Sequence, residues 1–267
     1  MNTARQFLAG AGTQTAALAI GGSTPTMTGA TESYDGTSWT EVNDLNTARG
    51  YLAGNGTQTS ALGYGGVPSG ITAATESWNG TSWTEVNDLN TARYILAGVG
   101  ADNTSALAFG GTPPLTGATE SWNGTSWTEV NDLNTARQNL AGAGTQTLAL
   151  AFGGTPPTTG ATETWNGTSW TEVNDLNTAR DGLGGVGTNT AALGFGGGPS
   201  ITASTESWNG TSWTEVNDLN LARERIGESG IQTAALAFGG DLPTPTVTAA
   251  TEEWNDPGTI IETITTS

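Results

Sequence analysis

Short apolar segments alternate with polar turns along the whole chain. Near the N-terminus, Phe7–Gly12 is a run of mostly small residues, and Thr15–Ile20 is an apolar run that stops at a Gly-Gly pair. Two further segments, Thr31–Tyr34 and Trp39–Val42, alternate between polar and apolar positions. Short runs and a period of two predict β-strands, and no segment shows the 3.6-residue period of a helix. The pattern therefore predicts four short strands in this part of the chain.

The same pattern returns six times. The segment Asn-Thr-Ala-Arg, or Asn-Leu-Ala-Arg in the last copy, recurs with a period of 44 or 43 residues. A Gly-Gly pair follows, then a Thr-Glu pair with an aromatic residue and, in the first five copies, an Asn-Gly or Asp-Gly turn and a Trp five residues after that aromatic residue. The turn indicates a hairpin between the last two strands. The repeated arginines are Arg5, Arg49, Arg93, Arg137, Arg180 and Arg223.

Four antiparallel strands in a repeat of roughly 40–50 residues are typical of a propeller blade. We therefore predict an all-β fold, a six-bladed β-propeller that occupies residues 1–267 as one domain. The blades cover approximately residues 1–45, 46–89, 90–133, 134–176, 177–219 and 220–267. Each blade is contiguous in sequence, so ring closure is expected to rest on packing between blades one and six. In the sixth copy the place of the second Trp is assigned to Thr259.

The order Arg, Gly-Gly, Glu-Tyr/Trp-Asp/Asn and Trp resembles the kelch repeat, over essentially the whole chain. The five-residue spacing from the aromatic residue to Trp is shorter than is usual in that family, which implies a tighter hairpin. The resemblance implies that partners approach the face carrying the fourth-to-first and second-to-third strand connections. It also implies that the second residue after each repeated Arg contacts them. These residues are Phe7, Tyr51, Ile95, Asn139, Gly182 and Arg225.

Composition excludes several kinds of chemistry. The chain has 7 basic and 25 acidic residues, a net charge of −18, and neither His nor Cys. It therefore lacks a His general base, a Cys nucleophile, disulfides and metal sites built on nitrogen or sulfur ligands. The acidic balance without a basic patch argues against nucleic acid and anionic membranes as partners. Since no apolar run is long enough to span a bilayer and the N-terminus lacks a signal pattern, we expect no membrane insertion and no secretion.

The residues that recur in every copy are expected to build the blades. The ten Trp would supply buried anchors, with sugar stacking as the alternative. The six repeated Arg would pair with the Thr-Glu glutamates, with an anion-binding ring around the channel as the alternative. The acidic Glu-Val-Asn-Asp segments lack the spacing of a calcium loop, so we expect no metal site and no cofactor.

Differences between the copies concentrate at two places, the pair after each Arg and the loop between the second and third strands. In a four-stranded up-and-down blade both places lie on one face. Variation on one face of a repeated scaffold predicts a binding surface, with neutral drift of loops as the alternative. The candidate ligand-binding residues are Phe7, Tyr51, Tyr94, Ile95, Asn139, Asp181, Glu224, Arg225 and Asp241.

Two classes of function fit this surface. The first is a non-catalytic recognition or structural module. Thr/Gly-rich kelch arrays of this kind look similar to proteins of marine phages, which implies a virion or tail component, cytoplasmic before assembly, that binds a host-surface glycan or another virion protein. A general protein-interaction scaffold is a further alternative.

The second class is a glycoside hydrolase that would use Asp181, Glu224 and Asp241 on the variable face. Kelch-type copper radical oxidases need His and Cys, which this chain lacks. Clustered acids with a raised pKa would favour hydrolysis, whereas acids spread along a rim beside exposed aromatic residues would favour recognition.

Overall fold

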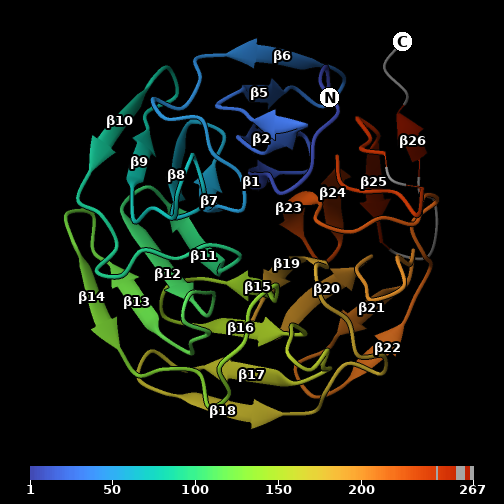
Figure 1. Ribbon diagram of the computed structural model, residues 1–267. Coiled ribbons are helices and arrows are strands. Elements are labelled where there is room, and N and C mark those ends of the chain that lie inside the picture. The colour runs from blue at the N-terminus through green and yellow to red at the C-terminus, as the bar shows by residue number, and fades with distance from the viewer. Residues whose placement is uncertain (245, 257–261, 265–267) are drawn as a thin grey trace.

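Six four-stranded antiparallel sheets form a closed ring around a central channel (Figure 1). The structure is a computed structural model that describes residues 1–244, 246–256 and 262–264. Within these residues every regular element is a strand, and no helix is long and apolar enough to cross a membrane. The predicted six-bladed propeller with sequence-contiguous blades is thus confirmed.

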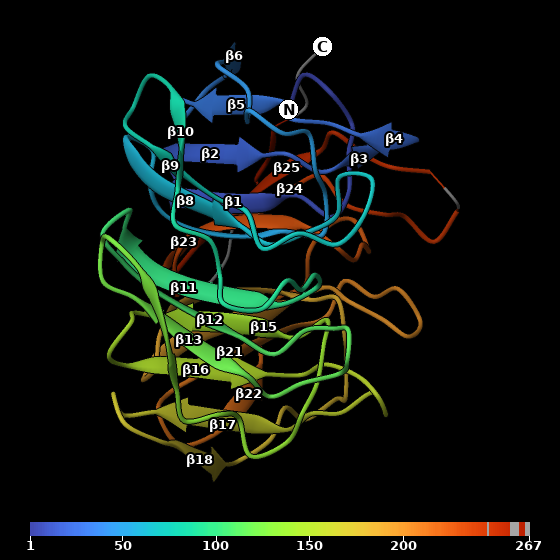
Figure 2. The ribbon, with the colours of Figure 1, turned by 60° about the vertical axis from the view of Figure 1, so that its left-hand side comes forward.

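The strands of blades one to three, in chain order, are β1 (Ala9–Thr13), β2 (Ala16–Ile20), β5 (Thr31–Tyr34), β6 (Trp39–Val42), β7 (Ala53–Thr57), β8 (Ser60–Tyr64), β9 (Thr75–Trp78), β10 (Trp83–Val86), β11 (Ala97–Asp102), β12 (Ser105–Phe109), β13 (Thr119–Trp122) and β14 (Trp127–Val130). Those of blades four to six are β15 (Ala141–Gly144), β16 (Ala149–Phe152), β17 (Thr162–Trp165), β18 (Trp170–Val173), β19 (Gly184–Thr188), β20 (Ala191–Phe195), β21 (Thr205–Trp208), β22 (Trp213–Glu215), β23 (Gly227–Ile231), β24 (Ala234–Phe238), β25 (Thr251–Asn255) and β26 (Glu262–Ile264). A small hairpin, β3 (Ser23–Thr24) and β4 (Thr26–Met27), projects from one face of the ring (Figure 2).

The innermost strand of each blade consists largely of Gly and Ala because neighbouring blades approach closely at the channel. A Cβ added to Gly98 of β11 would lie 1.8 Å from the hydroxyl oxygen of Tyr64 in the preceding blade. The Gly-Gly pairs meet a similar constraint. Gly65 and Gly66 have φ values of +66° and +98°, and the Gly66 amide donates to the carbonyl oxygen of Arg93 in the next blade (3.0 Å). Only Gly adopts this backbone without a steric penalty.

Each repeated Arg forms a buried ion pair with the Glu of its own blade, as the sequence predicts. In blade three, Arg93 Nη2 lies 2.8 Å from Glu120 Oε1, and both side chains are about 1% exposed. The other carboxylate oxygen of Glu120 accepts hydrogen bonds from the backbone and side-chain amides of Asn90 (2.7 and 2.8 Å). This Arg–Glu–Asn node ties the linker that enters the blade to its third strand.

The two aromatic residues of each hairpin have different partners. Trp122 Nε1 donates to the carbonyl oxygen of Asn103 within its own blade (3.0 Å). Trp127 Nε1 donates to the hydroxyl oxygen of Thr75 in the preceding blade (3.1 Å). The second Trp of blades one, two, four and five makes the same bond to the preceding blade, so these residues join the blades to one another.

The ring closes between blades six and one by the same contacts. Trp39 Nε1 donates to the hydroxyl oxygen of Thr251 (3.0 Å), and the Gln14 side-chain amide donates to the carbonyl oxygen of Trp254 (2.7 Å). Met1 takes the place that Leu45 has in the next linker, buried and donating its nitrogen to the Ala249 carbonyl oxygen (2.7 Å). The predicted closure by packing is therefore observed, and all four strands of blade six come from that blade's own sequence.

The last hairpin departs from the predicted spacing. In β25 and β26, Glu252 pairs with Thr263 and Glu253 with Glu262, whereas in blade two the corresponding Glu76 pairs with Glu85. Ten residues therefore separate Glu252 from its partner Thr263, against eight between Glu76 and Glu85. The place of the second Trp, assigned to Thr259 from the sequence, lies outside the described residues.

We expect Glu120→Ala to lower the free energy of unfolding by about 3–5 kcal/mol, because it leaves the Arg93 charge buried without its partner. Urea unfolding followed by Trp fluorescence would measure the change. Glu129, which faces Glu120 across the same hairpin but is exposed, provides the control, and Glu129→Ala should change stability by less than about 0.5 kcal/mol. Equal effects of the two substitutions would show that the ion pair does not stabilise the blade.

Candidate functional site

A closed circle of backbone hydrogen bonds surrounds the channel mouth on the variable face. In each blade the second residue after the repeated Arg donates its amide to the carbonyl oxygen of the equivalent residue in the preceding blade, over 2.8–3.1 Å. All six residues have φ values between 47° and 63°. This left-handed conformation is uncommon for residues other than Gly and is strained for a β-branched residue such as Ile95. The six are Phe7, Tyr51, Ile95, Asn139, Gly182 and Arg225.

The backbone also brings the two variable places together. The first residue after each repeated Arg forms an antiparallel bridge with the residue that follows the Gly-Gly pair, as between Tyr94 and Thr112 or Glu224 and Asp241. Both variable places therefore lie on the same face of the ring, as the strand order predicts.

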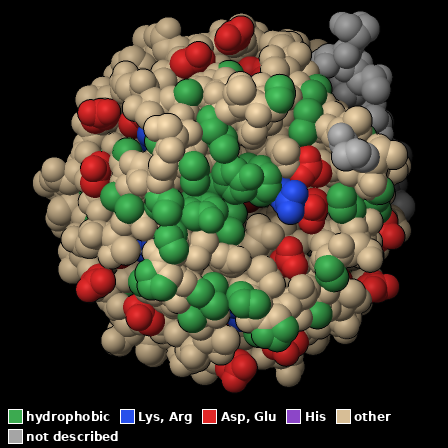
Figure 3. All heavy atoms as spheres, viewed as in Figure 1, with side chains coloured by type: hydrophobic (Ala, Val, Ile, Leu, Met, Phe, Trp, Pro, Cys, Tyr) green, Lys and Arg blue, Asp and Glu red, His purple; other side chains and the backbone are tan. Residues whose placement is uncertain are grey.

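Three aromatic side chains pack together at this mouth. The rings of Phe7 and Tyr51 are stacked with centroids 3.7 Å apart, and Tyr94 meets Tyr51 edge to face at 5.8 Å. All three are partly exposed. Figure 3 shows hydrophobic side chains gathered over the centre of this face, beside a cationic side chain flanked by acidic ones. Arg225 is partly exposed, whereas the other six Arg are buried.

Arg225 links the aromatic cluster to an acidic one. Its guanidinium carbon lies 4.6 Å from the centroid of the Phe7 ring, within the range of a cation–π interaction. Its Nη1 lies 2.9 Å from Asp241 Oδ2 and 3.3 Å from Glu224 Oε1. The Gln6 amide, in the orientation that satisfies both of its polar atoms, donates to Asp241 (2.7 Å to Oδ1). Arg225 is 34% exposed and is held in place on two sides.

A pocket of about 390 Å³ opens beside Arg225, and we call it the Arg225 pocket. Polar and charged side chains line one part of it, and apolar side chains from the loops of blades five and six line the rest. Its lining residues are Gln6, Ile201, Glu224, Arg225, Asp241, Leu242, Pro243, Thr246 and Val247. Its volume lies within the range of small-ligand sites, roughly 300–1,000 Å³.

A second pair of carboxylates lies between blades five and six. A Cβ added to Gly198 would lie 2.7 Å from Glu224 Oε2 and 3.9 Å from Asp181 Oδ1, so the two acids face the same point. Asp181 accepts hydrogen bonds from the Asn139 amide and the Thr158 hydroxyl (both 2.9 Å). Burial raises the pKa of Glu224, and the neighbouring Asp181 and Asp241 charges add to this while Arg225 opposes it. The predicted acids are therefore clustered, which is the arrangement that favours hydrolysis.

The structure brings all nine candidate residues to one face, and eight of them form three groups. Phe7, Tyr51 and Tyr94 form the aromatic cluster, Arg225, Glu224 and Asp241 form the ion-pair cluster, and Asn139 joins Asp181 beside it. Ile95 contributes to the circle of hydrogen bonds and to the channel wall, away from the Arg225 pocket.

Sequence reasoning did not select Gln6, Ile201, Leu242 or Val247 as candidates, although they line the Arg225 pocket. One signal was present in the sequence. The Thr-Glu glutamate lies twelve positions after the second Gly in the sixth copy, against nine or ten in the others. That longer loop supplies Leu242 and Val247. A further residue, Glu228 in the channel, was also not selected.

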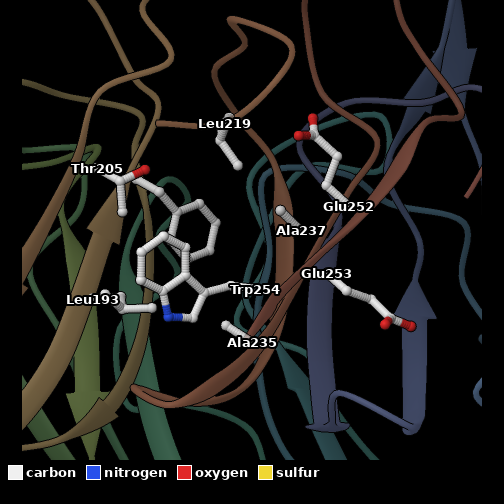
Figure 4. A pocket seen from close by; sticks show the side chains of 9 residues that line it. Leu193, Thr205, Leu219, Ala235, Ala237, Glu252, Glu253 and Trp254 are labelled. Atoms are coloured by element: carbon white, nitrogen blue, oxygen red, sulfur yellow. The ribbon is translucent and has the colours of Figure 1, made fainter. Parts of the chain in front are cut away.

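A second pocket, enclosed and apolar, lies between blades five and six on Leu193, Phe195 and Trp254 (Figure 4). In the preceding blade the equivalent space holds Trp213, which packs on Phe152 and donates to the Thr162 hydroxyl oxygen. Phe195 and Thr205, which line the pocket, are the equivalents of Phe152 and Thr162. The sixth copy has no second Trp in its sequence. With a volume of about 20 Å³, this pocket has room for little more than one water molecule, so it reflects core packing.

No protein-family model and no curated protein sequence matches the chain. Solved structures do match, among them the structure of YjhT, with a TM-score of 0.79. That match covers 98% of this chain and 97% of the YjhT chain at 11% sequence identity. At this identity the likeness concerns the fold alone.

We expect Ile95→Asn to raise the free energy of unfolding by about 1 kcal/mol, since Asn tolerates the left-handed backbone better than Ile. Asn139 already occupies the equivalent position one blade later. Ile95→Val is the matched control, because Val keeps the β-branch and should give no gain. Thermal and urea unfolding would measure the stability of both variants. A loss of stability in Ile95→Asn would contradict the inference that the backbone is strained at Ile95.

Proposed function

We propose that this propeller is a non-catalytic recognition module that binds a glycan at the Arg225 pocket and the adjoining aromatic cluster. The observation that carries the proposal is the position of Arg225, which stacks on Phe7, pairs with Asp241 and lines the pocket. A site for a sugar needs an apolar platform next to charged hydrogen-bonding groups, and these groups meet at Arg225.

The two clusters suit the two sides of a sugar ring. The C–H face of a pyranose would pack on the partly exposed rings of Tyr51 and Tyr94. Its hydroxyl groups would donate to the carboxylates of Glu224 and Asp241, and charge-assisted hydrogen bonds of this kind are stronger than neutral ones. Since Arg225 and Gln6 already hold these two carboxylates in place, little ordering of them would be required on binding.

The charge balance suggests which sugars would bind. Glu224 and Asp241 flank Arg225, the one partly exposed Arg among the described residues, and Asp181 lies beside Glu224. The chain as a whole carries a net charge of −18, so its field repels anions. Neutral or amino sugars are therefore preferred over sialic and uronic acids in this proposal.

The setting that we propose is a virion or tail component of a phage, where a glycan on the host surface would be the ligand. Its support is the resemblance of the Thr/Gly-rich repeats to kelch arrays of marine phages. Peptides of this chain in mass spectra of purified virions would test the setting, and their absence from virions of a phage that expresses it would exclude it.

A glycoside hydrolase is the second candidate, favoured by the pairing of Asp181 and Glu224 near Gly198 and by the raised pKa of Glu224. Glu224 would be the proton donor and Asp181 the ionised partner. The first candidate is preferred because the paired Arg225 favours the ionised form of Glu224, which accepts hydrogen bonds from a sugar but has no proton to donate to a leaving group.

A glycan array with the intact protein tests the first candidate. We expect neutral or amino glycans to bind, and we expect Tyr51→Ala and Arg225→Ala to weaken binding by at least about tenfold, the effect of losing a contact worth about 1.4 kcal/mol. Leu148→Ala is the control, because Leu148 is 48% exposed on the opposite face and should leave binding unchanged. No binding by the intact protein would instead favour a protein-docking role.

Hydrolysis is tested with the glycans that bind. Recognition without catalysis predicts that prolonged incubation releases no reducing sugar and that Glu224→Gln changes binding alone. Release of reducing sugar by the intact protein, lost in Glu224→Gln and retained in Glu129→Gln, would make the hydrolase the correct assignment.

A further inference from the structure

One carboxylate stands alone in the channel. Glu228 lies on β23 opposite Ala237 of β24, and in the other five blades the residue at this register is Gly. Those glycines are Gly10, Gly54, Gly98, Gly142 and Gly185. The sequence signal is the replacement of the Ala-Gly pattern by Gly-Glu-Ser-Gly in the sixth copy.

The Glu228 side chain reaches along the channel. It lines three successive cavities, of about 100 Å³ at the variable mouth, about 70 Å³ in the middle and about 100 Å³ at the opposite mouth. The wall of the middle cavity is mostly polar, although Glu228 is accompanied there only by Gly, Ala and Leu. Its other polar atoms therefore belong to the backbone of the inner strands.

Among the described residues, no side chain or backbone group forms a hydrogen bond or ion pair with the Glu228 carboxylate. The side chain is accessible from the channel, but protein surrounds it, and this burial raises the pKa of Glu228 to about 8. A carboxylate in such a place is costly unless a cation or hydrogen-bond donor accompanies it. The nearest strands, β1, β19 and β24, carry no titratable side chain.

We propose that the Glu228 carboxylate, with backbone carbonyl oxygens of the inner strands and water, binds a hard cation of the Ca²⁺ class in the channel. Such cations take oxygen ligands in flexible shells of six to eight, and carbonyl oxygens are common among them. The cavities are large enough to hold an ion together with several waters. The acidic protein attracts cations to this site.

The proposal carries a proton linkage. Near pH 7 the free carboxyl group is largely protonated, so a bound cation must displace a proton. Affinity for Ca²⁺ should therefore increase from pH 6 to pH 8 and level off above that. Calorimetry in two buffers with different ionisation enthalpies would detect the release of up to one proton per ion at pH 7.

The decisive experiment compares Ca²⁺ binding by the intact protein and two variants. Glu228→Gly restores the residue found in the other five blades, and Glu228→Gln preserves the shape of the side chain. We expect Ca²⁺ to bind the intact protein and raise its Tm, and we expect both variants to lose at least tenfold in affinity. Glu129→Gln, which removes an exposed acid outside the channel, is the control and should keep the response.

Two results would overturn the proposal. One is the absence of any Ca²⁺ binding by the intact protein in metal-free buffer at pH 8. The other is an equal response in Glu228→Gly, which would place the ion among the surface acids. Na⁺ at equal ionic strength should not reproduce the Tm shift. If it did, the shift would reflect screening of the net charge and not an ion bound at Glu228.

Discussion

The buried Arg–Glu–Asn node is the interaction on which the rest of the structure depends. A carboxylate and a guanidinium are each costly to bury, and the cost is recovered only when both are paired and hydrogen-bonded. Burial lowers the pKa of Arg223 to about 10, and Glu252 opposes this effect. Each node fixes the linker against the third strand of its blade, so the position at which the chain leaves the Arg is the same six times. The next two residues are thereby delivered to the channel mouth.

At the channel mouth, the fold constrains the backbone of the six residues in the circle but does not require a particular side chain at these positions. The circle of six hydrogen bonds uses only amides and carbonyls, and it is complete with Phe, Tyr, Ile, Asn, Gly and Arg at its six positions. The left-handed conformation of Ile95 shows that the circle is maintained even where the residue is unfavourable. A backbone-defined ring therefore permits variation at the positions where a ligand would bind. Stability comes from the buried nodes and Trp contacts, and variation at the mouth does not disturb them.

The sequence predicts what is repeated and local. Six copies spaced 43 or 44 residues apart identify the blades, and the Thr-Glu pairs identify partners for the buried Arg. Strand order alone places both variable places on one face. The sequence does not predict contacts that depend on three-dimensional closure. The stacking of Phe7 on Tyr51 and Arg225 joins residues from blades one, two and six. Ten residues separate Glu252 from its partner Thr263, against eight in the corresponding pair of blade two, and the sequence repeat alone does not give this difference. Glu228 replaces a Gly in the sixth blade only, so a comparison that looks for residues shared by all copies does not select it.

Departures from the repeat gather in the sixth blade. It supplies Glu224, Arg225, Asp241 and Glu228, has the longest loop between its second and third strands, and lacks the second Trp. A ring of six identical blades would present six equivalent weak sites around its axis, and a single ligand on that axis could not distinguish them. One altered blade breaks this equivalence. Five regular blades supply the stability and the closed circle, and the altered blade then supplies the charge, the pocket and the channel carboxylate. The altered blade is therefore where specific recognition is expected to reside.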